Sequence, residues 1–145
     1  MGGLRAFLAH PAVRRSAQLL AGAIFVLAAL PKIADLSAFA SSIHNYHMEP
    51  VLPVASINVL AMVLPWIELT AGLALILAIK PRAGAFVYTG LLTLFTVAVA
   101  VAMARGLSFD CGCFGTATAT TIGAKKLAEN VGMLAVGLVA GSERR

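Results

Sequence analysis

Residues 83–104 read AGAFVYTGLLTLFTVAVAVAMA, an uninterrupted run of 22 residues without a charged side chain. An α-helix rises about 1.5 Å per residue, and about 20 apolar residues are enough to cross the hydrocarbon core of a bilayer. The dipeptide Arg105-Gly106 closes the run at its C-terminal end. We therefore predict that residues 83–104 form a transmembrane helix.

The composition of the whole chain agrees with this segment. Of the 145 residues, 60% are hydrophobic and 12% are charged, and the mean hydropathy is +0.92. Soluble domains average about 45–50% apolar and about 25% charged residues, so a soluble globular protein is excluded. The length leaves room for about four membrane helices. We predict an all-α polytopic membrane protein, a four-transmembrane-helix bundle, with residues 1–145 forming a single integral membrane domain.

Three other apolar segments supply the remaining predicted spans. The first covers about residues 15–33 and carries Lys32 near its end. The second covers about residues 53–79 and contains one internal charged residue, Glu68. The fourth covers about residues 120–141 and is the weakest by hydropathy, because charged side chains occupy its first turns.

The loop between the first two spans has a helical pattern of its own. Leu36, Ala40 and Ile43 recur at the spacing of one helix face. Pro50 and Pro53 then end the pattern. We therefore expect a short extracytoplasmic surface helix, which lies at the boundary between the bilayer and water.

Basic residues decide the predicted orientation. Lys and Arg number 11 against 6 Asp and Glu, and in a membrane protein this net charge of +5 indicates cytoplasmic loops rather than nucleic-acid binding. One predicted side holds Arg5, Arg14, Arg15, Lys80, Arg82, Arg144 and Arg145. The other side holds only Lys32, Arg105, Lys125 and Lys126. We expect a multi-pass protein of the bacterial inner (plasma) membrane, surrounded by the lipid bilayer, with both termini in the cytoplasm.

The chain has two cysteines, one residue apart, in the sequence Asp110-Cys111-Gly112-Cys113 on the predicted extracytoplasmic side. That compartment is oxidising in bacteria. Gly112 permits the tight turn that a disulfide between these cysteines requires. Closing a ring this small removes little conformational entropy from the unfolded chain, so the disulfide would add little to the stability of the fold. It is better suited to exchange with another thiol.

Neighbouring charges bear on the reactivity of this exposed cysteine pair. Arg105, Lys125 and Lys126 favour the thiolate, because a positive charge lowers the pKa of a thiol. Asp110 disfavours it, although its carboxylate can accept a proton. Both cysteines, together with Asp110, are therefore candidate catalytic residues.

Two other interpretations of the cysteines stay open. In the first they form an inert disulfide or serve as small packing residues. In the second they bind a soft metal such as Cu(I) or Hg(II), with Met48 or Met103 as a third ligand. The metal site ranks lower because no third ligand is convincing, and His44 and His47 alone do not make a zinc site.

Some functional candidates lie inside the predicted spans. An unpaired Glu68 at mid-depth costs at least about 2.5–3.5 kcal/mol, so Lys32 is its expected partner. A structural ion pair and a proton-handling catalytic role for these two residues are equally open. Trp66 either packs beside Pro65 or stacks on a quinone, which makes it the candidate cofactor-binding residue. Asn130 is expected to hydrogen-bond across helices.

Four stretches of this sequence resemble one known family. They are LPKIAD at 30–35, FASSIHNY at 39–46, LPWIEL at 64–69 and DCGCFG at 110–115. Together they are similar to the MauE family of methylamine utilisation, a branch of the DoxX-like four-helix membrane proteins, over about residues 15–140. The Asp-Cys-Gly-Cys-Phe-Gly element is the most specific of the four.

The resemblance implies the pathway in which the protein acts more than the reaction that it carries out. Proteins of the family are associated with a thioredoxin-like protein and with maturation of a disulfide-rich periplasmic enzyme. A role in methylamine metabolism does not follow from it, because related proteins occur outside that pathway.

The leading hypothesis is a membrane thiol–disulfide oxidoreductase that exchanges its Cys-Gly-Cys disulfide with an extracytoplasmic thioredoxin-like partner. Quinone is the candidate membrane cofactor. The direction of electron flow and the roles of attacking and resolving cysteine stay open. The alternatives are a copper- or mercury-binding or transport protein and a non-catalytic assembly subunit.

Overall fold

A computed structural model describes residues 1–111 and 121–142 of the chain. This part is all-α, and its only β-type pairing is an isolated bridge. The helices are α1 (Gly2–Leu8), α2 (Pro11–Ala34), α3 (Leu36–His44), α4 (Val54–Ile76), α5 (Pro81–Ala104) and α6 (Ala124–Ala140).

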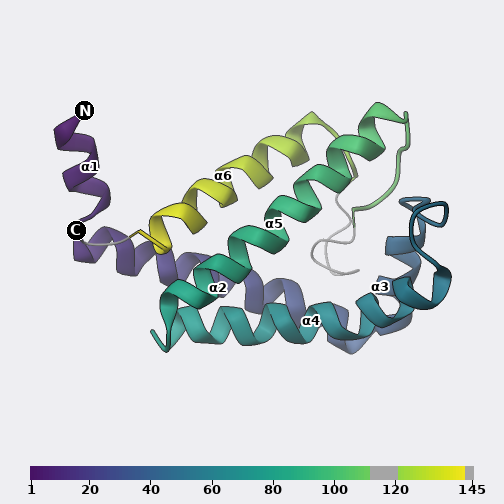
Figure 1. The fold of residues 1–145 in the computed structure, drawn as a ribbon, viewed down its shortest axis with the longest axis horizontal. Helices are drawn as coiled ribbons and strands as arrows, with labels where there is room; N and C mark the ends of the chain where they lie inside the picture. Colours follow the sequence, from purple (N-terminus) through teal and green to yellow (C-terminus); the bar gives the residue numbers. More distant parts are fainter. Residues whose placement is uncertain (112–120, 143–145) are drawn as a thin grey trace.

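The long helices pack lengthwise against one another (Figure 1). α2 contacts α4 most extensively, α6 lies against both α2 and α5, and α4 also contacts α5. The short helix α3 packs against α4 at one end of the molecule. The start of α2, the α4–α5 turn and the end of α6 lie together at the other end.

Helices α2, α4 and α5 are long and apolar enough to cross a membrane, at 24, 23 and 24 residues. They coincide with three of the predicted spans, and the chain is a membrane protein. Helix α6 has 17 residues, from 124 to 140, rather than the predicted 120–141. It starts later because residues 121 and 122 pair with the chain that follows α5. Its crossing of the membrane stays a prediction.

Small residues let α2 and α4 approach closely. A Cβ added at Gly72 would lie 2.9 Å from the carbonyl oxygen of Gly22, and one added at Gly22 would lie 2.7 Å from that of Gly72. Close backbone contact of this kind is a common source of packing energy between membrane helices. Gly137 of α6 plays a similar part against α5, where an added Cβ would lie 2.6 Å from the Tyr88 ring.

Side chains form hydrogen bonds with backbone groups at the helix ends that border the membrane. The Arg15 guanidinium donates to the carbonyl oxygens of Leu75, at 2.9 Å, and Ile76, and so satisfies acceptors that the end of α4 leaves open. Asp35 caps α3 by accepting from the backbone N–H of Ala38 at 2.9 Å. This hydrogen bond and one from Ser37 lower the pKa of the Asp35 carboxyl. The expected short helix between the first two spans is thus confirmed as α3.

The Gly22–Gly72 contact predicts a specific sensitivity. Gly72→Ala should destabilise the fold by about 1–3 kcal/mol, because the new Cβ meets backbone rather than a movable side chain. Gly90→Ala is the matched control, since nothing lies within 4 Å of its added Cβ. Unfolding in mixed micelles, followed by helical circular dichroism as denaturing detergent is raised, measures both. Equal stability of the two variants would contradict the close contact.

Candidate functional site

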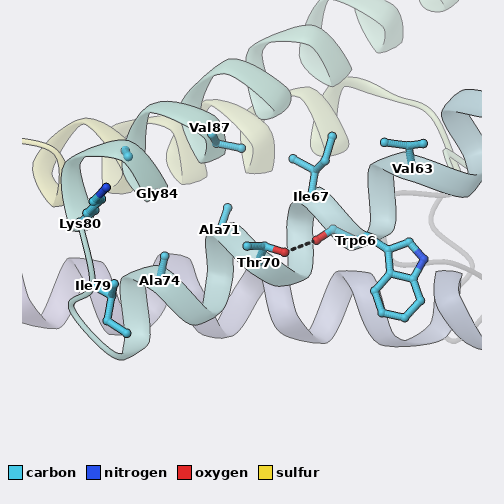
Figure 2. A pocket seen from close by; sticks show the side chains of 11 residues that line it. Val63, Trp66, Ile67, Thr70, Ala71, Ala74, Ile79, Lys80, Gly84 and Val87 are labelled. Carbon is cyan, nitrogen blue, oxygen red and sulfur yellow. Dashed lines mark hydrogen bonds between the residues drawn. The ribbon is translucent and has the colours of Figure 1, made fainter.

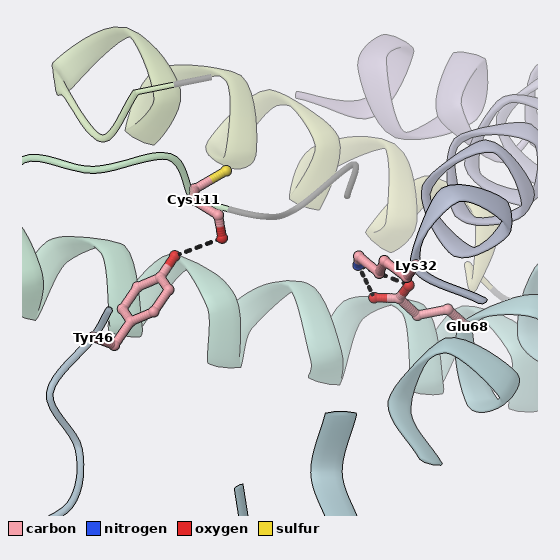
Figure 3. A network of polar contacts seen from close by, with 4 residues as sticks. All are labelled: Lys32, Tyr46, Glu68 and Cys111. Atoms are coloured by element: carbon pink, nitrogen blue, oxygen red, sulfur yellow. Dashed lines mark hydrogen bonds and ion pairs between the residues drawn. The ribbon is translucent and has the colours of Figure 1, made fainter. Parts of the chain in front are cut away.

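The main polar contact inside the membrane region joins α2 to α4 (Figure 3). Lys32 Nζ donates to both carboxylate oxygens of Glu68, at 2.8 and 2.9 Å. The two side chains are 1% and 2% exposed, respectively. The predicted pairing is therefore confirmed, while a catalytic role for either residue stays a prediction.

Aromatic rings enclose the cationic end of this pair. The Lys32 ammonium lies 4.9 Å from the centre of the Phe39 ring and 5.1 Å from that of Phe95. Cation–π attraction adds to the ion pair most where water is excluded. The ion pair joins α2 and α4, and the rings of Phe39 and Phe95 belong to α3 and α5. Four helices therefore meet at this ion pair.

Cys111 lies beyond the end of α5 and is buried, at 3% exposed. It packs in a cluster with Tyr46, Val99 and Ile122. The Tyr46 hydroxyl donates to the carbonyl oxygen of Cys111 at 3.0 Å (Figure 3). The expectation of an exposed thiol is thus wrong for Cys111, because this cluster removes it from solvent.

Backbone pairing holds both sides of the cysteine segment. Asp110 and Thr121 form an antiparallel bridge, and the Ile122 N–H donates to the Phe109 carbonyl at 2.9 Å. Asp110 itself is exposed, which leaves its carboxylate accessible to solvent. Cys113 and the other residues of 112–120 lie outside the described residues, so the expectations for Cys113 and for the Cys-Gly-Cys ring are untested.

Arg105 supports this region through hydrogen bonds to backbone carbonyls. Its guanidinium donates to the carbonyl oxygens of Tyr46, at 3.1 Å, and His47, at 3.2 Å. The segment after α3 is thereby tied to the end of α5. Tyr46 also stacks edge-on against Phe109, with ring centres 4.7 Å apart. These contacts fix the side chain that holds the Cys111 backbone.

Helix α5 connects the cysteine region to the ion pair. Phe95 contacts the Lys32 ammonium, and Val99 packs in the Cys111 cluster. Four residues of helix separate them, a rise of roughly 6 Å along the axis. A displacement of α5 at Phe95 would therefore also displace Val99, and the reverse.

Trp66 lies on the surface of α4, at 55% exposed. It is therefore not part of the buried core, and packing beside Pro65 stays a prediction. The indole lines one end of an apolar hollow of about 490 Å³ between α4 and α5, with Lys80 at the other end (Figure 2). A quinone-stacking role stays a prediction.

Two polar residues of α6 are buried, which was not expected for Lys126. Lys126 is 1% and Asn130 is 0% exposed. Their i,i+4 spacing places them on one helix face, which is the signal that could have revealed them. Lys126 lies 3.6 Å from the Glu129 carboxylate. The Asn130 amide has no hydrogen-bond partner within the described residues, so the expected interhelical bond is not made there.

The histidines of the α3 region lie among ordinary polar neighbours. His44 approaches the Glu49 carboxylate at 3.5 Å and the Asn58 side-chain oxygen at 3.4 Å. Within residues 1–111 and 121–142, no three or more His, Cys, Asp or Glu side chains gather as metal ligands do. The described part of the chain therefore offers no conventional cage for a zinc ion.

The ion pair predicts strong coupling between two positions. Lys32→Met or Glu68→Leu alone should destabilise the fold by about 3–5 kcal/mol, because each leaves a buried charge without its partner. The double variant should recover most of that loss, since two apolar side chains of similar size replace both charges. Detergent unfolding of all four proteins gives the coupling. Additive losses would show that the two residues act independently.

Comparison with known proteins assigns the chain to a family. The family model for methylamine utilisation protein MauE matches residues 9–142. A methylamine utilization protein MauE from Methylorubrum extorquens is 30% identical over 112 residues, which make up 77% of this chain and 59% of that relative. The protein of the same name from Methylophilus methylotrophus is 35% identical over 104 residues, 71% of this chain and 53% of the relative.

A third relative supports the same assignment. The methylamine utilization protein MauE of Paracoccus denitrificans is 32% identical over 109 residues, 74% of this chain and 57% of the relative. The chain thus spans between half and three-fifths of the length of these relatives. No solved structure matches it significantly. Because the family model covers most of the chain, this protein belongs to the MauE family.

Proposed function

We propose that this protein is a membrane thiol–disulfide oxidoreductase, which exchanges a disulfide between Cys111 and Cys113 with an extracytoplasmic thioredoxin-like partner. The observation that carries the proposal is the fixed position of Cys111. The Tyr46 hydroxyl holds its carbonyl, and the adjoining Asp110–Thr121 bridge holds the chain on either side. A reactive cysteine needs such support, because exchange requires three sulfur atoms in line.

The exchange balances without any further oxidant. A thiolate of the reduced partner attacks the Sγ atom of Cys113, and the bond to Cys111 breaks, so that Cys111 leaves as a thiolate. The second thiol of the partner then attacks its own bridging sulfur and frees Cys113. The partner has lost two electrons and two protons and holds a disulfide, while this chain holds two thiols. The reverse sequence carries the electrons the other way.

The two cysteines have different roles in this scheme. Cys111 is 3% exposed, so a second protein has little access to its sulfur. We therefore assign the mixed disulfide with the partner to Cys113. Cys111 is the leaving thiolate when the partner is oxidised, and it is the resolving thiol when electrons flow the other way. Asp110 is the proposed proton acceptor, because it is exposed and adjoins Cys111 in the chain. Glu68 and Lys32 are proposed as a more distant proton-holding pair, linked to this region through α5.

The orientation proposed above supports this chemistry. In the bacterial inner membrane, with α6 as a fourth span and both termini in the cytoplasm, the cysteines face the oxidising compartment. Helix α6 packs on α2 and α5, which is the place of a fourth member of a bundle. Its 17 residues rise roughly 26 Å, enough for a thin or locally thinned bilayer. All parts of the chain then form a single membrane domain.

The likeness to the MauE family suggests a use for such exchange. The relatives are named for methylamine utilisation. For this chain we propose disulfide exchange during maturation of an extracytoplasmic enzyme that contains several disulfides. The partner is identified by its chemistry, a Cys-x-x-Cys dithiol that reaches the membrane surface.

A soft-metal site is the second candidate function. Met48 and Met103 are partly buried and pack against the cluster that contains Cys111. Thioether and thiolate sulfur together suit Cu(I). This alternative predicts stoichiometric Cu(I) binding by the purified protein, lost in a Met48→Leu, Met103→Leu variant, and no exchange with a dithiol protein.

Trapping of the mixed disulfide tests the proposed exchange. Cys111→Ser should accumulate a covalent adduct with the oxidised partner, because the Cys113 thiolate can still attack the disulfide of the partner and Cys111 is no longer there to displace it. Cys113→Ser should give at least about tenfold less adduct, since the remaining sulfur is buried. Acid quenching of intact cells followed by non-reducing electrophoresis measures both, and reductant should dissolve the adduct.

The double variant Cys111→Ser, Cys113→Ser is the control for non-specific capture. Equal adduct from both single variants would contradict the assignment of roles. Absence of any adduct, together with Cu(I) binding that depends on the methionines, would replace thiol exchange by the metal alternative.

A further inference from the structure

Two hollows meet at the end of the molecule where the α4–α5 turn lies. One is the apolar hollow between α4 and α5, which Trp66 lines. The other has a volume of about 490 Å³ and a polar lining that includes Arg14, Gln18, Lys80, Arg82 and Ser142. They share Lys80 and Ala83, so they form one continuous surface feature.

The polar hollow carries unneutralised positive charge. Arg14 and Lys80 make no ion pair or side-chain hydrogen bond with any of the described residues. Its described lining contains no Asp or Glu. The neighbouring carbonyl acceptors are already occupied, since Arg15 donates to Leu75 and Gln18 donates to Ala140 at 3.1 Å. Arg14 and Lys80 are therefore available for an external anion.

The start of α5 adds to this positive field. The N-cap of α5 is Lys80, and no side chain caps this helix end. The N-terminal end of a helix dipole favours a bound anion, and the effect is strongest within the first turn. A phosphate group in the polar hollow would therefore meet two side-chain cations and a positive helix end.

The apolar hollow has the dimensions of one lipid chain. It runs along α4 from Ala74 to Val63, a helical rise of roughly 16 Å. That distance is about half of the 30 Å hydrocarbon core, which is the depth of one leaflet. The hollow is open at the protein surface, and its wall near the α4–α5 turn includes Gly84 (Figure 2). An acyl chain whose headgroup lies at Lys80 would end near Trp66.

We propose that this continuous feature binds one anionic phospholipid, with its phosphate between Arg14 and Lys80 and an acyl chain along α4 and α5. Basic pockets between membrane helices are suited to acidic headgroups. A neutral quinone carries no charge that would neutralise the two cations, whereas a phosphate group does. The site is independent of the cysteine chemistry proposed above.

Trp66 provides the readout, because it is the only tryptophan of the chain and lines the inner end of the apolar hollow. The full-length protein is reconstituted in phosphatidylcholine vesicles that contain a small fraction of lipid with brominated acyl chains. Brominated phosphatidylglycerol should quench Trp66 fluorescence several times more strongly than brominated phosphatidylcholine at the same mole fraction.

Variants of the two cations test the headgroup contact. Lys80 has a φ angle of 47°, a conformation that glycine adopts without strain, so Lys80→Gly removes the charge while keeping the backbone. Lys80→Gly and Arg14→Gln should each lower the preference for phosphatidylglycerol by about fivefold. Lys80→Gln is a second variant that keeps a side chain. Arg5→Gln, a charge change on α1 outside the hollow, should leave the preference intact.

Three results would overturn the proposal. The first is equal quenching by the two brominated lipids in the unaltered protein. The second is loss of the phosphatidylglycerol preference in the presence of millimolar inorganic phosphate, because a free anion would then be the ligand. The third is stronger quenching by ubiquinone in neutral vesicles that displaces brominated phosphatidylglycerol and does not change in the Lys80→Gly variant.

Discussion

The ion pair between Lys32 and Glu68 is the constraint around which this membrane fold is arranged. Either charge alone would cost at least about 2.5–3.5 kcal/mol in the middle of a bilayer, so each must lie where the other can reach it. That requirement fixes the register of α2 against α4. It also directs both polar faces toward the interior, where Phe39 and Phe95 exclude water and lipid.

The glycine contact between the two helices is consistent with this register. Gly22 and Gly72 make a close backbone contact between α2 and α4. Lys32 lies roughly 15 Å from Gly22 along the axis of α2. Glu68 lies only roughly 6 Å from Gly72 along the axis of α4, so the backbones of the two charged residues are not level with each other. Side chains lean toward the N-terminus of their own helix, and in this antiparallel pair that lean brings the ammonium and the carboxylate together. The glycine contact and the ion pair therefore support each other.

Helix α5 extends the arrangement to the cysteine region. Its Phe95 covers the Lys32 ammonium, and its Val99 packs beside Cys111. Arg105, which follows α5, binds the chain that carries Tyr46, and Tyr46 holds the Cys111 carbonyl. The residue proposed to resolve a mixed disulfide is thus positioned by the same helix that closes the charged interior.

The sequence predicted those parts that depend on local physics. Long uncharged runs identify α2, α4 and α5, because a bilayer demands length and apolar character within one segment. The Lys32–Glu68 pair was predictable for an energetic reason, since a lone intramembrane charge needs a partner. The burial of Cys111 was not, because it depends on Tyr46, which lies 65 residues away in the chain. The exposure of Trp66 likewise depends on how α4 meets α5, which no single segment specifies.

Redox titration of the cysteine pair from outside the membrane tests the proposed function most directly. Right-side-out vesicles are equilibrated in dithiothreitol buffers of stepped redox potential and then treated with a membrane-impermeant maleimide. The Cys111→Ser variant is the control that stays labelled at every potential, because ring closure of dithiothreitol releases any mixed disulfide at Cys113. The proposed exchange predicts one two-electron transition, with labelling that appears above about −300 mV as the buffer is made more reducing. Labelling that requires broken vesicles, or a transition well below that potential, would contradict it.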